Sequence, residues 1–222
     1  MAKNIETKKR TIRIAIDNIK STTYIKYLET RFNIEKIFSF SDLSKSHEKV
    51  NLIVFTGGAD VNPGLYGEIV GKHTHINPER DGIEYDIATH YMYSNTLKLG
   101  ICRGAQLLTV ASGGKLIQHV NGHGITHDIS IDLGSVVNVK DRYYDEDLID
   151  DNDNSLTLPM TSSHHQMMYP YNLKDTNYDL LAWSTYFLSD TYLDGTDSEK
   201  NVKSGFLEPE IVFYNKRKSL CI

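Results

Sequence analysis

Cysteine is scarce in this chain of 222 residues, which contains only Cys102 and Cys221. Two cysteines are too few for the disulfide framework that holds many small secreted proteins together. The low count fits a reducing, cytoplasmic setting, in which a free thiol stays available for chemistry. The sequence also lacks any apolar stretch of transmembrane length. The apolar run at residues 11–16 contains Arg13 and is too short for the core of a signal peptide.

An excess of basic residues is missing as well. The 24 lysines and arginines are outnumbered by 29 aspartates and glutamates, and the formal net charge is −5. Because no basic stripe is present, nucleic acid is not expected as a partner. No interdomain linker, internal repeat or long block of like charge interrupts the chain, and 40% of its residues are hydrophobic. We therefore predict a single domain over residues 1–222 with one substantial core.

Apolar runs alternate with amphipathic stretches in the first half of the chain, which is typical of successive βαβ units. The run at residues 50–58 is almost continuously apolar, as expected for a strand buried on both faces of a parallel sheet. Catalytic residues gather at the carboxyl ends of such strands, so Gly57-Gly58 and Cys102 are expected to face one another. We predict strands at residues 11–16, 34–40, 50–58 and 97–101, and helices at residues 22–32, 81–93 and 105–111.

The last third of the sequence contains short β-like pieces separated by polar turns. The acidic stretch 145–154 is predicted to be a solvated loop, because its composition cannot bury a core, and it gives only a weak signal for a bound cation. The predicted fold is α/β: a flavodoxin-like, doubly wound, mostly parallel sheet with helices on both faces and a β-rich C-terminal third. The strands predicted in that third are residues 135–140, 156–158 and 180–185, and a hairpin of 211–214 and 219–222 with a turn at 215–218.

A cysteine stands between two glycines in Gly100-Ile101-Cys102-Arg103-Gly104, where a short apolar run gives way to a helical one. The G-x-S-x-G elbow of α/β-hydrolases has the same form, because its glycines let the backbone turn sharply under the nucleophile. At the start of a helix, Cys102 gains N–H groups that can hold an oxyanion. The partial positive charge of the helix end also predicts a thiol pKa below the ordinary value. A buried structural cysteine is the simpler alternative.

Five segments, in this order, resemble the class I glutamine amidotransferase-like superfamily, and within it the gamma-glutamyl-gamma-aminobutyrate hydrolase type of cysteine peptidase. They are TGGADVNPGLYGE (56–68), PERDGIEYDIA (78–88), LGICRGAQLLTVASGGKLIQHV (99–120), NGHGITHDI (121–129) and SSHHQ (162–166). The resemblance covers roughly residues 50 to 215. Five matches in order make it specific, whereas one alone is weak.

The resemblance implies that Cys102 attacks a glutamine-type amide to give a gamma-glutamyl thioester. It implies an oxyanion hole made by the N–H of Arg103 and one N–H of the pair Gly57-Gly58, and glycines there allow the backbone to approach the oxyanion closely.

The resemblance also implies how the substrate is bound. Gln106, four residues after the nucleophile, matches a position that contacts the bound glutamyl group, and His164, His165 and Gln166 resemble the substrate-side motif of the hydrolase branch. A polar loop that merely caps the site is the simpler reading of these three residues.

Several histidines raise the question of a metal site. His119, His123 and His127 recur every four residues, and His73 and His75 lie in GKHTH. Glycines at 122 and 124 break the helix that would align the first three. The family has similar histidines and needs no metal, so the resemblance implies no metal and no cofactor.

The chain departs from the family at its end. Cysteine amidotransferases need a histidine to take the thiol proton and a carboxylate to orient it, and the family supplies both in a His-Pro-Glu motif after the last strand. No such motif follows the strand that reaches Ile222, and Glu208-Pro209-Glu210 has no histidine before it. The sequence therefore predicts an enzyme that is truncated or a natural pseudoenzyme, inactive or impaired as written, unless His164 or His165 serves as the base.

Three functions follow from these observations. The first is a cysteine-dependent amidohydrolase that cleaves a gamma-glutamyl amide to glutamate and an amine. The second is a glutaminase subunit that passes ammonia to a synthetase partner. The third is a catalytically silent domain that binds a glutamyl ligand. In each case the expected ligand is a gamma-glutamyl amide or glutamine, and neither nucleic acid nor a membrane is expected as a partner.

Overall fold

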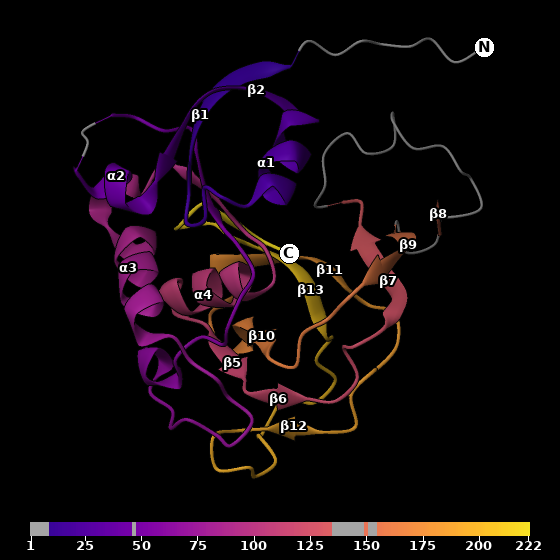
Figure 1. Ribbon diagram of the computed structural model, residues 1–222. Coiled ribbons are helices and arrows are strands. Elements are labelled where there is room, and N and C mark those ends of the chain that lie inside the picture. Colours follow the sequence, from indigo (N-terminus) through magenta and orange to yellow (C-terminus); the bar gives the residue numbers. More distant parts are fainter. Residues whose placement is uncertain (1–8, 46–47, 135–148, 151–154) are drawn as a thin grey trace.

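A ten-stranded sheet forms the centre of the computed structural model, which describes residues 9–45, 48–134, 149–150 and 155–222 (Figure 1). In the order in which they lie side by side, its strands are β2 (Phe32–Ser39), β1 (Arg10–Ile16), β3 (Leu52–Phe55), β4 (Leu97–Gly100), β14 (Ser219–Cys221), β13 (Pro209–Tyr214), β11 (Tyr178–Ser184), β7 (Thr126–Asp132), β9 (Ser155–Thr161) and β8 (Ile149–Asp150). Two small sheets pair β10 (Met167–Tyr169) with β5 (Lys115–Ile117), and β12 (Tyr192–Leu193) with β6 (His119–Val120).

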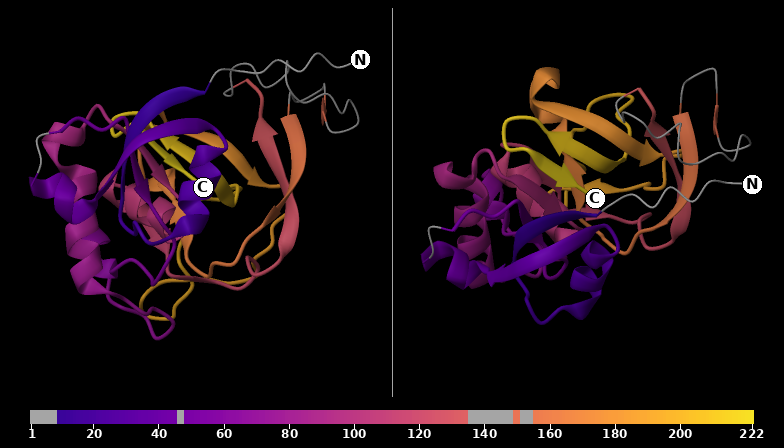
Figure 2. Two further views of the ribbon diagram at one scale, coloured as in Figure 1. Left: turned by 45° about the horizontal axis from the view of Figure 1, so that its top comes forward. Right: turned by 90° about the horizontal axis from the view of Figure 1, so that it is seen from above.

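The sheet changes character along its width. Strands β2, β1, β3, β4 and β14 pair in parallel, whereas β14, β13, β11, β7, β9 and β8 pair antiparallel. Because β1 lies between β2 and β3, the chain winds away from β1 in both directions, as in flavodoxin-like folds. Figure 2 shows the orange and yellow C-terminal strands beside the indigo-to-magenta N-terminal part. The predicted fold class is confirmed.

Helices cover both faces of the parallel part, because alternate residues of its strands point to opposite sides. On one face Ile14, Ile16 and Val54 pack with Leu28 of helix α1 (Thr22–Glu29). On the other face Ala15, Ile53 and Phe55 pack with residues of α2 (Phe40–Lys45), α3 (Pro78–Thr89) and α4 (Arg103–Ala111). None of the described helices has the length and apolar character needed to cross a membrane.

Three helices were expected and are present with shifted ends. Helix α1 ends at Glu29 and β2 begins at Phe32, earlier than predicted. Helix α3 begins at Pro78 because the Asn77 side chain accepts the Arg80 N–H at 3.2 Å and so caps the first turn. Helix α4 begins two residues before the predicted start, directly after Cys102. Helix α2 replaces the predicted end of the second strand and was not expected.

In the last third, the strands predicted at 156–158 and 180–185 correspond to β9 and β11, and the terminal hairpin corresponds to β13 and β14. The strand predicted at 135–140 lies outside the described residues. Within the predicted acidic loop, residues 149–150 pair with β9 as the short strand β8, so the loop prediction is wrong for these two residues. Backbone N–H and C=O groups can be satisfied by pairing with another strand whatever the side chains are, so an acidic composition does not exclude a short strand.

Substitution of Gly104 tests the close approach between β3 and α4. A Cβ built on Gly104 lies 2.1 Å from the Phe55 carbonyl oxygen, whereas one built on Gly82, in the middle of α3, meets nothing within 4 Å. We predict that Gly104→Ala lowers the free energy of unfolding by about 1–3 kcal/mol, through forced displacement of packed backbone. Gly82→Ala is the matched control and should raise it by about 0.5–1 kcal/mol. Urea denaturation measures both; equal shifts in the two variants would contradict the proposed contact.

Candidate active site

Cys102 lies on a strained turn between β4 and α4. Its backbone angles are φ 54° and ψ −113°, a conformation that residues with a side chain rarely adopt. The two flanking glycines make the turn possible: a Cβ on Gly100 lies 2.5 Å from the Gly104 backbone, and Gly104 itself lies against Phe55. The predicted nucleophile elbow therefore has the geometry that its glycines indicate.

The prediction of a lowered pKa for the Cys102 thiol is wrong. Burial raises this pKa above its ordinary value, although the N–H of Arg103 acts to lower it, and the Asp60 carboxylate raises it further. The cause is that desolvation of a thiolate outweighs the favourable end of helix α4. The elbow positions the sulfur at the helix N-terminus, but the position alone does not produce a thiolate at neutral pH.

The predicted oxyanion donors lie on two sides of Cys102. The Arg103 N–H points at the sulfur, and a Cβ built on Gly57 lies 3.8 Å from the Cβ of Cys102. The Gly57 N–H donates to the Tyr24 hydroxyl at 3.2 Å. Because that N–H is engaged, the donor that the pair has left for an oxyanion is the N–H of Gly58, which lines the same cavity as Cys102.

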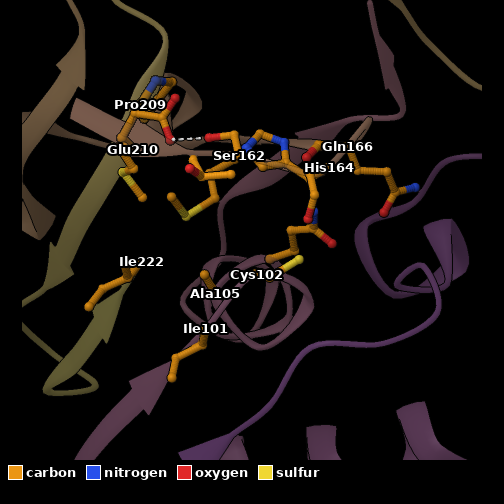
Figure 3. A pocket seen from close by; sticks show the side chains of 14 residues that line it. Ile101, Cys102, Ala105, Ser162, His164, Gln166, Pro209, Glu210 and Ile222 are labelled. Carbon is orange, nitrogen blue, oxygen red and sulfur yellow. Dashed lines mark hydrogen bonds between the residues drawn. The ribbon is translucent and has the colours of Figure 1, made fainter. Parts of the chain in front are cut away.

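Two cavities flank Cys102. The larger, of about 260 Å³, has Gly58 on one side and residues 163–166 on another. The smaller, of about 130 Å³, separates Cys102 from Glu210. Figure 3 shows Cys102 on one side of the smaller cavity, with Ser162 and Glu210 across from it. A substrate in either cavity would lie beside the sulfur.

Gln106 and Gln166 line both cavities and are buried, with exposed fractions of 6% and 1%. The Gln106 Nε2 donates to the Gln166 backbone oxygen at 2.9 Å. Neither the Oε1 nor the Nε2 of Gln166 has a hydrogen-bond partner within the described part of the chain. Since buried polar groups are costly when unpaired, this amide is available to a ligand as both donor and acceptor.

His165 lies at the mouth of the larger cavity, where its Nε2 is 3.1 Å from the Asp60 carboxylate. The hydrogen bond to Asp60 raises the pKa of His165. Burial acts to raise the pKa of Asp60, but hydrogen bonds from His165 and from the His75 N–H lower it overall. Asp60 was not predicted as a site residue, and nothing in its sequence position indicates the contact.

His164 is buried and lines both cavities. Burial and the neighbouring His123, whose ring centroid lies 4.8 Å from that of His164, lower the pKa of His164 to about 4. The ring is therefore neutral at pH 7. No imidazole among the described residues forms a hydrogen bond with the Cys102 sulfur.

A buried ion-pair network supports the elbow and was missed in the sequence. The Arg103 side chain is 1% exposed; its Nη2 is 2.5 Å from the Asp81 carboxylate and its Nη1 contacts Glu84. Asp81 and Glu84 both come from α3, three residues apart and hence on one face of the helix. The sequence shows that the start of α3 is charged, but it does not show that Asp81 and Glu84 point inward, because that direction depends on how α3 packs against α4.

Arg80 extends this network to the loop after β3. Its guanidinium contacts Asp17 and Glu84. It also donates to the Gly57 carbonyl at 3.1 Å and to the Thr56 carbonyl at 3.2 Å. The side chain thereby fixes the loop that presents the Gly57-Gly58 backbone to Cys102. A side chain on Gly58 would meet Arg80, since its Cβ lies 2.1 Å from the Nη1.

The histidines considered as metal ligands separate into different places. His73 stacks on His119, with ring centroids 4.2 Å apart, and His75 lines the larger cavity. His123 and His127 do come together, with ring centroids 5.6 Å apart. His123 lies in the loop before β7 and His127 lies on β7, so these two histidines are not aligned by a helix.

Comparison with known proteins finds one matching family profile and several similar proteins. The profile of the Peptidase C26 family matches residues 24–170. A glutamine amidotransferase-like protein of Lactococcus lactis, YvdE, is 45% identical over 73 residues, which make up 32% of this chain and 31% of that protein. A Mycobacterium tuberculosis protein provisionally named a glutamine amidotransferase is 39% identical over 74 residues, 33% of this chain and 24% of that protein. The matched segments thus span about a third or less of these relatives.

Solved structures share the fold at low identity. A protein of Thermoplasma acidophilum, provisionally named as one of the subunits of GMP synthase, superposes with a TM-score of 0.55 at 13% identity, covering 96% of this chain and 83% of that chain. The glutaminase domain of Trypanosoma brucei CTPS, solved with bound acivicin, superposes with a TM-score of 0.54 at 12% identity, covering 91% and 81%.

Removing Arg103 tests the buried ion pairs. Arg103→Met leaves the Asp81 and Glu84 carboxylates buried without their main partner, and we predict a loss of about 3–5 kcal/mol in the free energy of unfolding. Arg13, which is 39% exposed and 3.6 Å from Glu35, is the control: Arg13→Met should change stability by less than about 1 kcal/mol. Chemical denaturation measures both variants. Comparable small losses would show that the network contributes little.

Alkylation distinguishes the two thiols. Cys221 is fully buried and burial raises its pKa strongly, whereas Cys102 is partly exposed. We predict that limiting iodoacetamide labels Cys102 first, and that Cys221 reacts only after unfolding. Because the pKa of Cys102 is itself raised, its labelling should be slow at pH 7 and faster with each step toward pH 9. Peptide mass spectrometry gives both rates; preferential labelling of Cys221 in the folded protein would refute the elbow assignment.

Proposed function

Because the chain belongs to the peptidase C26 family, we propose that it is a cysteine-dependent amidohydrolase that cleaves a gamma-glutamyl amide to glutamate and an amine. One observation carries this proposal: the strained backbone of Cys102 presents its sulfur to a cavity that Gly58 and Gln166 also line. A general hydrolase-type activity agrees with the family profile. The gamma-glutamyl substrate is the specific part of the proposal.

The proposed reaction begins when the Cys102 sulfur, as thiolate, attacks the side-chain amide carbon. The carbonyl oxygen becomes an oxyanion, for which the N–H groups of Arg103 and Gly58 are the donors. Collapse of this intermediate breaks the C–N bond, and the amine leaves with a proton. Water then attacks the thioester, which releases glutamate and restores the thiol. Cys102 and Gly58 line the same cavity, and the Arg103 N–H points at the sulfur.

The unpaired amide of Gln166 supports an amino-acid substrate. A glutamyl group carries an α-ammonium and an α-carboxylate, and Gln166 offers an acceptor and a donor that have no partner within the described residues. Gln106 lies beside it and is held by its bond to the Gln166 backbone. His165 and Asp60 at the cavity mouth add a hydrogen-bonded pair that the amine side of the substrate can meet.

Proton removal from Cys102 is expected to limit the rate of the proposed reaction. No described imidazole hydrogen-bonds to the sulfur, and burial raises the thiol pKa. We therefore expect acylation to be slow when these residues act alone. His164 is neutral at pH 7 and lines both cavities beside Cys102, so it is the first residue to test as a base.

A second candidate is a glutaminase subunit that supplies ammonia to a synthetase partner. The structural likeness to one of the named subunits of GMP synthase and to a CTPS glutaminase domain favours this candidate. It predicts that glutamine is hydrolysed faster when the partner is present.

We further propose that residues 1–222 form a single domain, and that the free thiols Cys102 and Cys221 reflect a reducing, cytoplasmic compartment.

Acivicin tests the nucleophile and the glutamyl pocket together. This glutamine analogue carries a chlorine that a thiolate displaces, so covalent capture adds the mass of acivicin less HCl. We predict one adduct on Cys102 by intact-protein and peptide mass spectrometry, none in Cys102→Ala, and an unchanged adduct in the control Cys221→Ser. Excess glutamate should slow capture. Rapid, glutamate-insensitive capture would contradict a glutamyl pocket.

Turnover separates the candidates. Release of aminobutyrate from gamma-glutamyl-aminobutyrate, and of ammonia from glutamine, is measured for the native chain, Cys102→Ala and His164→Ala. If His164 is the base, its substitution lowers kcat about 10²–10⁴-fold. If it only lines the pocket, KM rises while kcat is kept. Acivicin capture with no turnover of either substrate would instead support the glutamyl-binding domain without hydrolysis.

A further inference from the structure

His123, His127 and Glu210 converge in the protein interior on the far side of the smaller cavity from Cys102. The Glu210 Oε1 lies 3.1 Å from the His123 Nδ1 and 2.9 Å from the His127 Nε2. All three residues are buried, and their ligand atoms lie within 4.8 Å of one another. We propose that these three residues form a binding site for a divalent transition-metal ion such as zinc, a site that does not depend on the proposed hydrolase activity.

The first argument is that His123 lacks satisfactory partners. Its side chain is fully buried, and neither ring nitrogen forms a hydrogen bond of acceptable geometry with the described residues. Carboxylates nevertheless lie near both nitrogens. The two His123 nitrogens are therefore free to direct a lone pair to a cation, whereas the His127 Nε2 and the Glu210 Oε1 are hydrogen-bonded at 2.9 Å and the ion would replace that contact.

The second argument is a complete outer set of acceptors. Metal-bound histidines donate their other ring N–H to a carboxylate or a carbonyl. On the side of His123 away from Glu210, the Nε2 is 3.5 Å from the Glu208 Oε2. On the corresponding side of His127, the Nδ1 is 3.5 Å from the Ile125 carbonyl oxygen. An acceptor therefore lies near the outer ring nitrogen of each histidine, although the Glu208 carboxylate is not aligned with the His123 ring nitrogen for a hydrogen bond.

The carboxylate ligand is held in the same way. The second oxygen of Glu210 accepts a hydrogen bond from the Ser162 hydroxyl at 3.5 Å (Figure 3). Glu210 comes from β13 and His127 from β7, the two strands that flank β11, while Ser162 follows β9. Two of the three ligands thus sit on strands of the main sheet, which suits a preformed site, while His123 lies in the loop before β7.

The donor set indicates the class of metal. Two imidazole nitrogens with one carboxylate oxygen suit zinc, cobalt or another borderline ion, whereas magnesium and calcium prefer oxygen ligands. Glu208 and Glu210 carry two negative charges in a buried environment, and a divalent ion balances both. In a tetrahedral zinc site, ligand atoms stand about 3.3 Å apart, close to the carboxylate distances found here.

The ion would act on the candidate active site through His164. The ring of His164 stacks on that of His123, and the His164 N–H donates to the His123 carbonyl at 3.1 Å. Glu210 and His164 both line the smaller cavity beside Cys102. An ion bound to His123 and Glu210 would therefore fix the wall of that cavity. This differs from the expectation drawn from the family resemblance, which implied no metal.

The competing arrangement is a proton in place of the ion. Burial opposes protonation of His123, but the adjacent Glu208 and Glu210 raise its pKa to about 9, so an ion-free protein holds an imidazolium there. The two states differ in what they bind. A metal site binds one ion per chain, and the ion is coordinated by the two histidines and Glu210. The protonated cluster binds no ion.

Cobalt provides the test, because Co²⁺ in a tetrahedral site of nitrogen and oxygen ligands absorbs visible light. The purified chain is stripped with a chelator and titrated with Co²⁺ at pH 8. We expect saturation at one equivalent, bleaching when Zn²⁺ is added, since zinc binds such sites more tightly, and a higher Tm in the presence of Zn²⁺. A native chain that takes up no Co²⁺ or Zn²⁺ refutes the proposal and leaves the protonated cluster.

Three variants locate the ion. His127→Ala removes a ligand and should abolish the visible band, while Ser162→Ala keeps all ligands and should weaken Co²⁺ binding about 10–100-fold. His90→Ala, an exposed histidine at the end of α3, is the control and should bind as the native chain does. Circular dichroism checks that each variant is folded. Equal binding by His127→Ala and the native chain would place the ion elsewhere and overturn the assignment.

Discussion

The buried guanidinium of Arg103 is the interaction on which the candidate active site depends. Its side chain joins α4 to α3 through Asp81 and Glu84, while its N–H points at the Cys102 sulfur. Glu84 also contacts Arg80, which holds the Gly57 carbonyl. One connected set of charges therefore fixes both the elbow and the opposing glycine loop. The desolvation of these charges is costly, so the network is better understood as a device for alignment than as a source of net stability.

The two parts of the sheet supply different chemistry. The parallel part presents Cys102 and the proposed oxyanion donors at the carboxyl ends of β3 and β4, where doubly wound folds place their sites. The antiparallel part brings the opposite wall: the segment 162–166 follows β9, and Glu210 comes from β13. The walls of the candidate site therefore depend on pairings between strands that are distant in sequence, because the two cavities are lined by residues from both parts.

Sequence patterns predicted the local features well, because those features are encoded locally. Continuous apolar runs indicated the buried strands, and Gly100 and Gly104 indicated the turn at Cys102, since only glycine fits that contact. The thiol pKa was predicted wrongly because burial, a tertiary property, opposes the helix end. The approach of Glu210 to His127 also escaped prediction, because these residues are 83 positions apart and meet only through β11. Charges and histidines are visible in a sequence, but the direction in which each points is set by packing.

The strained backbone at Cys102 positions the sulfur but does not lower the pKa of the thiol. A side chain held at φ 54° is unfavourable by roughly 1–3 kcal/mol and persists because β4, β14 and α4 fix the backbone on every side. The Cys102 N–H donates to the Ile222 carbonyl at 2.7 Å, and the Ile222 N–H donates to Gly100 at 2.9 Å. This geometry directs the sulfur into a partly enclosed cavity, where fixed N–H donors can stabilise an oxyanion but burial makes a thiolate costly. The fold thus positions the sulfur but does not deprotonate it. A reaction at Cys102 therefore needs a proton acceptor that reaches the sulfur, because the helix end alone does not produce the thiolate.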